Sequence, residues 1–110
     1  MFELHQLRSR RVGLALSGGS VRGLAHIGVI KVLSEAGIRP AVITGTSAGS
    51  LIGAMLAAGM EWSEIASIAG KTFWPKLLHG ETLECFCEEH LPATFADLKL
   101  PFAVTATNCR

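Results

Sequence analysis

The arrangement of apolar and polar residues predicts a strand, a helix and a second strand in the first half of the chain. Residues 11–17 form a nearly continuous apolar run, which is typical of a strand covered on both faces in a parallel sheet. Apolar or small residues then recur with helical spacing from Val21 to Ala36, and Gly37 marks the end of that helix. Residues 41–44 form the second strand. Because parallel strands need a right-handed crossover, the loops after the two strands should lie side by side.

The second half of the chain predicts further helices and a third strand. Residues 51–58 are apolar all round, as expected of a helix packed on every side. Residues 61–71 and 81–90 have the spacing of amphipathic helices, and residues 102–107 have the pattern of a strand. The predicted fold class is therefore α/β, a three-layer α/β/α arrangement with a parallel sheet, preceded by an N-terminal extension over residues 1–10.

Composition and charge restrict the partners that the chain can have. Its 110 residues are enough for one domain at most, and 10 Lys plus Arg against 9 Asp plus Glu leave a formal net charge of +1. Arg8, Arg10 and Arg11 form only a short local cluster, which argues against a nucleic-acid partner. Charged residues make up 17% of the chain, below the roughly 25% that is usual. This indicates a chain built to be buried, or a piece of something larger.

Targeting signals are not apparent in the sequence. Residues 41–60 carry no charge, but polar residues at their middle divide them into a strand and a helix, so that we expect no transmembrane segment. The N-terminus lacks a charged start followed by a long apolar run. Three cysteines, an odd number, favour reduced thiols. We therefore expect a cytoplasmic protein that could lie peripherally on a membrane.

The loop after the second predicted strand has the pattern G-x-S-x-G of a nucleophile elbow. In this motif a strained turn exposes the serine hydroxyl, and the residues two before and two after it must be small. The serine is Ser47, and the elbow positions around it are Gly45, Thr46, Ala48 and Gly49. The serine also lies at a helix N-terminus, which favours developing negative charge. A tight turn with a purely structural role is the alternative.

The loop after the first predicted strand could supply an oxyanion hole, because its backbone amides could point at the volume occupied by the Ser47 hydroxyl. Its residues are Gly18, Gly19, Ser20, Val21, Arg22 and Gly23. A phosphate-binding loop is the alternative, but Leu24 and Ala25 stand where a Walker loop has Lys and Ser or Thr. A dinucleotide-binding motif would have glycine in place of Ser20 and an acidic residue at the end of the second strand.

These residues together resemble the N-terminal portion of a bacterial patatin-like phospholipase. Residues 13–29 resemble that family's glycine-rich segment, residues 45–50 resemble its serine motif, and residues 98–104 are similar to the segment that follows. The resemblance covers residues 11–110, which we interpret as the N-terminal part of a patatin-like domain, and therefore an incomplete one.

The resemblance implies a lipid acyl hydrolase that uses a serine and aspartate dyad and no catalytic histidine or cofactor. Ser47 would be the nucleophile, and the amides around Gly19, Ser20 and Val21 would hold the oxyanion. The substrate would be a lipid ester, met by the enzyme at a membrane surface.

Two departures from the family pattern bear on this interpretation. Ser20 stands where the family has a third glycine, so the loop keeps an amide donor but loses glycine's access to positive φ. The only aspartate, Asp97, is followed by Leu98 and not by the glycine of the family's Asp-Gly motif. We interpret Asp97 as a loop or capping residue and expect the catalytic aspartate beyond residue 110. The chain alone should then be inactive, and the alternative is a non-catalytic binding fragment.

Several other side chains have both a functional and a structural interpretation. His26 could be a base in a triad, but a satisfied histidine in the core or facing the sheet is favoured. Arg22 could orient the glycine loop, meet a lipid head group or simply be solvated. The aromatic residues Trp62, Phe73 and Trp74 could face lipid or be buried. A zinc site is disfavoured, because its candidate ligands have loose spacing. These candidates are His79, Cys85, Cys87 and His90.

Overall fold

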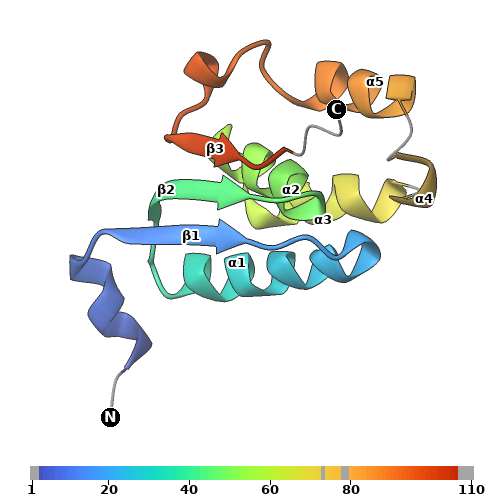
Figure 1. Cartoon of the computed structure of the whole chain (residues 1–110). Coiled ribbons are helices and arrows are strands. Elements are labelled where there is room, and N and C mark those ends of the chain that lie inside the picture. The colour runs from blue at the N-terminus through green and yellow to red at the C-terminus, as the bar shows by residue number, and fades with distance from the viewer. Residues whose placement is uncertain (1–2, 73, 78–79, 107–110) are drawn as a thin grey trace.

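The protein is described by a computed structural model that covers residues 3–72, 74–77 and 80–106. Its centre is a parallel sheet of three strands in the order β1-β2-β3 (Figure 1). The strands are β1 (Val12–Leu16), β2 (Pro40–Gly45) and β3 (Phe102–Val104). Leu16 is in register with Gly45, and Gly45 with Val104, so all three strands end at the same edge. The loops that follow them are therefore brought together.

Helices fill the connections between the strands. The 3₁₀ turn η2 (Ser20–Leu24) and helix α1 (Ala25–Glu35) join β1 to β2. Between β2 and β3 the described residues form the helices α2 (Ala48–Ala57), α3 (Trp62–Lys71), α4 (Trp74–Leu77) and α5 (Gly80–His90). Two further 3₁₀ turns are η1 (Leu4–Ser9) at the N-terminal end and η3 (Phe95–Asp97) before β3.

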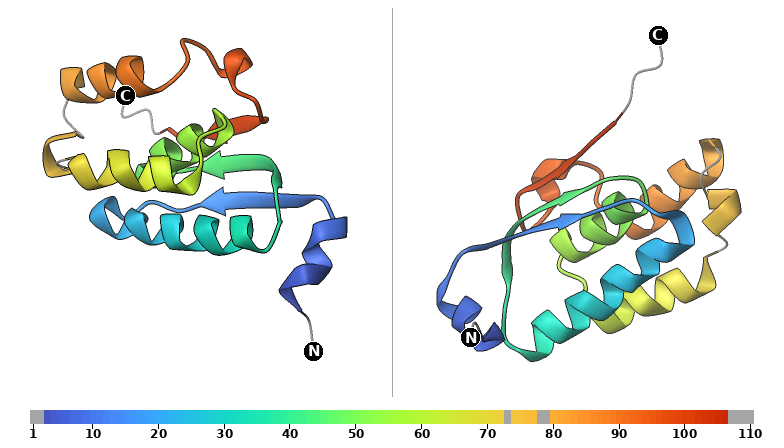
Figure 2. Two further views of the ribbon diagram at one scale, coloured as in Figure 1. Left: turned by 180° about the vertical axis from the view of Figure 1, so that it is seen from behind. Right: turned by 60° about the horizontal axis from the view of Figure 1, so that its bottom comes forward.

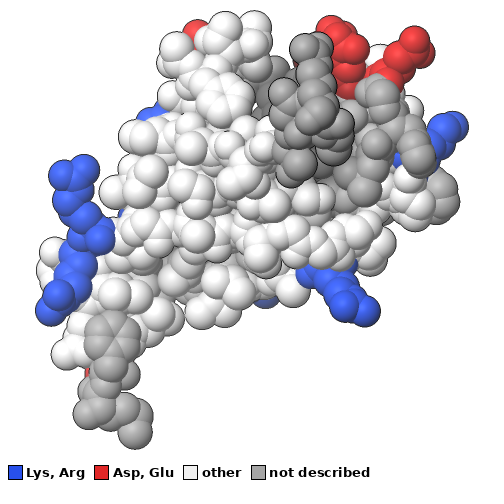
Figure 3. All heavy atoms as spheres, in the orientation of Figure 1, with Lys and Arg blue, Asp and Glu red and all other residues white. Residues whose placement is uncertain are grey.

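The two crossovers place α1, α2 and α3 on one face of the sheet (Figure 2). This follows from the strand order, because successive right-handed crossovers in one direction put their helices on the same side. The predicted α/β class with a parallel sheet is confirmed. The opposite face is open in the described part of the chain, where Val42 is 42% exposed and Thr44 is also exposed. In the orientation of Figure 1, charged side chains lie mainly at the margins of the visible face (Figure 3).

The core lies between β2 and α2. Its fully buried large side chains are Ile43, Ile52, Met55 and Ile65. Helix α2 is buried over most of its length, as predicted from its uninterrupted apolar sequence. Residues 41–60 contain nearly all of β2 and the whole of α2, which agrees with the predicted division into two elements. No helix in the described ranges combines the length and the hydropathy needed to cross a membrane.

The observed elements differ from the predicted ones, and helix α2, expected over residues 51–58, begins already at Ala48. The helix expected from Val21 begins as the tight turn η2 and becomes regular only at Ala25. Helix α4 was not predicted, because four residues are too short to show a period. Strand β3 ends at Val104, earlier than expected, although the Thr105 amide still donates a hydrogen bond to the Gly45 carbonyl at 3.2 Å.

Candidate active site

Ser47 lies in a strained turn between β2 and α2. Its backbone has φ 53° and ψ −123°, and it immediately precedes the first residue of α2. A residue with a Cβ adopts this conformation at a cost of about 1 to 3 kcal/mol. Ser47 is exposed, and no described group accepts or donates a hydrogen bond at its hydroxyl. The turn thus presents a free hydroxyl at the carboxyl edge of the sheet.

Glycines at positions 45 and 49 allow this turn to form. A Cβ on Gly45 would lie 2.5 Å from the Gly49 carbonyl oxygen. A Cβ on Gly49 would lie 2.2 Å from the carbonyl oxygen of Leu16, the last residue of β1. Both distances are far below any normal contact of a carbon with an oxygen. Helix α2 can therefore approach the ends of β1 and β2 only because both residues lack a side chain.

The glycine loop after β1 passes directly beside Ser47. A Cβ on Gly18 would lie 3.1 Å from the Cβ of Ser47 and 3.8 Å from its Oγ. Further along the loop, a Cβ on Gly23 would lie 2.7 Å from the Cβ of Ala48. The structure thus brings together the two loops that the sequence singled out.

The backbone of this loop leaves several amides unoccupied. Gly19 has φ 146° and Ser20 has φ 52°, so the chain turns sharply before η2. The N–H groups of Gly19, Ser20 and Val21 donate to no acceptor within the described residues, whereas the Arg22 amide donates to the Gly19 carbonyl at 3.0 Å. Ser20 adopts the positive φ that glycine reaches most easily, so the departure at this position leaves the turn in place.

Hydrogen bonds tie the serine turn to the end of β1 and to the residue that follows β3. The Thr46 amide donates to the Leu16 carbonyl at 3.0 Å, and the Thr46 Oγ1 lies 2.8 Å from the Oγ1 of Thr105. Thr105 was not singled out from the sequence, because nothing in its neighbourhood distinguishes it from other threonines at a strand end. Its contact fixes the residue just before Ser47.

His26 is paired with the backbone of the glycine loop. Its Nε2 lies 2.7 Å from the Ser17 carbonyl oxygen, a distance at which the ring N–H donates a hydrogen bond. The favoured interpretation of a satisfied histidine agrees with this contact. His26 thus holds the residue that precedes Gly18.

Asp97 lies away from Ser47. It belongs to η3, which precedes β3, whereas Ser47 follows the carboxyl end of the parallel strand β2 (Figure 1). Its carboxylate accepts a hydrogen bond from the Thr94 hydroxyl at 2.8 Å. The interpretation as a loop or capping residue agrees with this contact.

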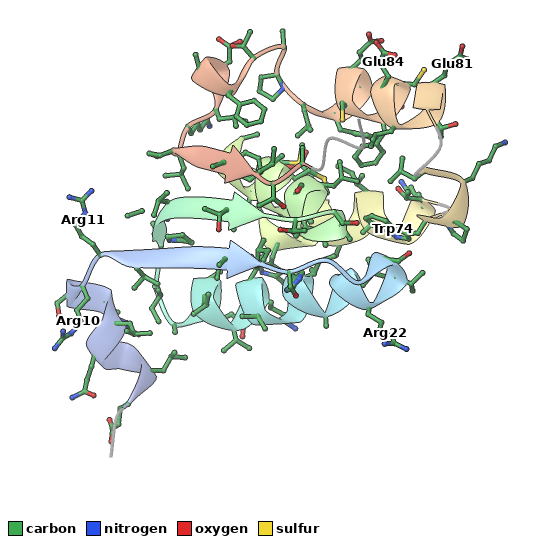
Figure 4. The ribbon with its side chains drawn as sticks, viewed as in Figure 1. Arg10, Arg11, Arg22, Trp74, Glu81 and Glu84 are labelled. Atoms are coloured by element: carbon green, nitrogen blue, oxygen red, sulfur yellow. The ribbon has the colours of Figure 1, made fainter. Side chains whose placement is uncertain are left out.

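The remaining candidates are dispersed. Arg22 is exposed and points away from the sheet (Figure 4). Trp74 is buried, and its indole N–H donates to the Ala69 carbonyl at 3.3 Å. Trp62 is half-buried, with the Lys31 ammonium 4.8 Å from its ring centroid. Phe73 and His79 lie outside the described residues.

The cysteines and histidine on α5 do not assemble a metal site in the described part of the chain, where no three potential ligands come together. Cys85 is exposed and Cys87 is half-buried, and both are free thiols. Burial raises the pKa of the Cys87 thiol above its ordinary value.

Comparison with known proteins places these features in a family. The family described as "Patatin-like phospholipase" matches residues 14–108. Lysophospholipase nte1 of Aspergillus fumigatus is 60% identical over 52 residues, which are 47% of this chain and 3% of that protein. Lysophospholipase NTE1 of Chaetomium globosum is 42% identical over 66 residues, which are 60% of this chain and 4% of that protein. These relatives are fungal, so they support the family but not the bacterial branch predicted above.

A solved structure shares the fold. The type III effector protein ExoU aligns with a TM-score of 0.55 and 31% identity over 72% of this chain and 15% of that chain. This chain therefore spans only a small part of the relatives that it matches. The match over residues 14–108 covers both loops at the candidate site and all three strands. The chain belongs to the patatin-like phospholipase family.

Proposed function

We propose that this chain forms the nucleophile-bearing part of a serine hydrolase that cleaves lipid esters. The observation that carries the proposal is the exposed Ser47 in a strained turn, with Gly18 beside it and free amides in the same loop. The matched family is one of phospholipases and the similar fungal proteins are lysophospholipases, which supports a lipid substrate.

In the proposed reaction, the Ser47 Oγ attacks the ester carbonyl carbon and gives up its proton to a base. The carbonyl oxygen becomes an oxyanion, which the amides of Gly19, Ser20 and Val21 stabilise. Loss of one such donor costs about 3 to 4 kcal/mol in comparable hydrolases. The leaving alcohol takes the proton and departs, and water then releases the acyl group from Ser47.

The backbone amide of Ala48 is a further donor for the oxyanion. It directly follows Ser47 and occupies the first position of α2, where amides have no partner within the helix. The sequence analysis assigned Ala48 to the nucleophile elbow and not to the oxyanion hole. The base is the aspartate that the family resemblance implies, and Asp97 does not fill this role, since it lies before β3.

We also propose the extent of the family segment in this chain and the cellular location of the protein. We place the patatin-like segment at residues 11–110, after an extension over residues 1–10, and we place the protein in the cytoplasm, in contact with a membrane surface that holds its substrate. The bacterial branch of the family stays a prediction.

A fluorophosphonate probe tests the proposal on the chain as it stands. We expect a phosphonylated Ser47 in the tryptic peptide map and no labelling in Ser47→Ala. Ser67→Ala, which removes an exposed serine of α3, serves as the matched control and should label like the parent. Absence of labelling in folded protein would instead favour a non-catalytic binding fragment. Because the one aspartate in the sequence, Asp97, lies away from Ser47, we expect ester turnover by this chain to stay at background. Turnover that depends on Asp97 would contradict the assignment.

A further inference from the structure

A cavity of about 270 Å³ lies at the edge of the sheet opposite Ser47. It is bounded by the start of β2, the end of α1, the segment between α2 and α3, and the segment before β3. These parts lie at the amino ends of the strands, toward the left of Figure 1. Most of its wall is apolar and includes Leu14, Ile30, Leu56, Met60, Trp62 and Leu100. The cavity is therefore separate from the candidate active site.

Two cations line this apolar cavity. Arg39 and Lys99 are exposed, and neither forms an ion pair within 4.0 Å with a described residue. Among the described side chains that line the cavity, Glu61 is the one acidic residue. Arg8 adds positive charge near the cavity, because its side chain lies beside the lining residue Gly37. A Cβ built on Gly37 would lie 3.4 Å from the Arg8 Nε. The balance of charge around the cavity favours an anion.

Glycine at position 59 sets the place of the Lys99 side chain. Gly59 lines the cavity with φ 98°, and a Cβ on it would lie 2.9 Å from the Lys99 Nζ and 2.7 Å from its Cδ. The Lys99 amide is fixed in turn by a hydrogen bond to the Ala57 carbonyl at 2.8 Å. The Lys99 ammonium group therefore lies close to the backbone of Gly59, at the wall of the cavity.

We propose that this cavity binds a single-chain carboxylate amphiphile, a medium-chain fatty acid anion. Its alkyl chain lies along the apolar wall beside Trp62, and its carboxylate meets Lys99 and Arg39. The volume is just below the roughly 300 to 1,000 Å³ of drug-sized ligand sites, which suits one alkyl chain better than two. This inference does not depend on any reaction at Ser47.

The position of the ligand is tested by fluorescence quenching in the full chain. Dodecanoate with bromine on its terminal carbon is titrated, because bromine quenches only a nearby indole. We expect saturable quenching that disappears in Trp62→Phe and persists in Ser47→Ala. The other tryptophan, Trp74, stays in place in both variants. Quenching that persists in Trp62→Phe with the same midpoint would place the ligand elsewhere and overturn the proposal.

The chemistry of recognition is tested by charge removal and by ligand choice. We expect Lys99→Gln and Arg39→Gln each to weaken dodecanoate binding about tenfold, the scale of one charge-assisted hydrogen bond. Lys76→Gln removes a matched exposed lysine of α4 and should bind like the parent. Dodecanol and acetate, which lack the carboxylate or the chain, should bind more weakly. Equal binding of dodecanol, or unchanged binding in both cavity variants, would overturn the proposal. Circular dichroism spectra of the variants exclude unfolding as the cause.

Discussion

The Cα of Gly49 packs against the carbonyl group of Leu16, so that an added Cβ would stand 2.2 Å from the carbonyl oxygen. This contact joins the start of α2 to the end of β1 and fixes the space between the serine turn and the glycine loop. Because both partners are backbone, neither can move aside as a flexible side chain would.

Gly49→Ala should therefore destabilise the protein by at least about 3 kcal/mol, since the clash can be relieved only by moving a helix or a strand. Urea denaturation followed by circular dichroism measures the change. Gly70→Ala is the matched control, because nothing lies within 4 Å of a Cβ at that position of α3. It should stabilise the protein by about 0.5 to 1 kcal/mol through helix propensity. Equal effects of the two substitutions would contradict the contact.

Backbone strain at Ser47 predicts a difference between two substitutions that both remove the hydroxyl. Ser47→Gly relieves the positive φ, whereas Ser47→Ala retains it. We expect Ser47→Gly to be more stable than Ser47→Ala by about 1 kcal/mol in urea denaturation. Neither variant should react with the fluorophosphonate probe. If the two unfold at the same urea concentration, the turn is not strained.

Substitution of Ser20 by glycine also tests backbone strain at a positive φ, and it leaves the proposed nucleophile in place. It has φ 52°, and its backbone amide, not its side chain, is proposed to act. Ser20→Gly should stabilise the protein by about 0.5 to 1 kcal/mol. The rate of Ser47 labelling should stay within about twofold of the parent, since glycine keeps the amide donor. A large loss of labelling would show that the serine side chain has a role of its own.

Much of the fold follows from local sequence, and the reasons are physical. The uninterrupted apolar run of α2 predicts a buried helix, and the small residues around Ser47 predict a close crossing of strand and helix. Short elements such as α4 carry no period and cannot be predicted in this way. The exposed face of the sheet around Val42 could not be predicted either. A continuous apolar strand predicts helices on both faces of the sheet, even where the structure has them on one face.

The site could be predicted only in part. The serine turn and the glycine loop are visible as motifs, because each needs glycine at fixed positions. The contact between Thr46 and Thr105 joins residues 59 positions apart, and the cavity beside Trp62 gathers residues from several separate segments. Neither leaves a local pattern. Both features depend on how the crossovers bring distant segments together. That arrangement becomes visible only in the folded structure.

The two described cysteines should differ in reactivity. Burial raises the pKa of Cys87, so that at a mildly alkaline pH a smaller fraction of its thiol is the reactive thiolate. Exposed Cys85 should therefore be alkylated first by iodoacetamide, as followed by peptide mass spectrometry. The rate at Cys87 should rise as the pH increases toward its raised pKa. Faster alkylation of Cys87 than of Cys85 would contradict the burial of that thiol.

His26 should act on Ser47 through the glycine loop and not as a base. Its ring donates to the Ser17 carbonyl, and that residue precedes Gly18, which lies beside Ser47. Loss of one hydrogen bond of about 1 kcal/mol should lower the rate of fluorophosphonate labelling about fivefold in His26→Ala. His26→Gln, whose amide N–H can reach the same carbonyl, should restore most of the rate, which a general base could not allow. If glutamine and alanine lower labelling equally and severely, the histidine takes a direct part in activating Ser47.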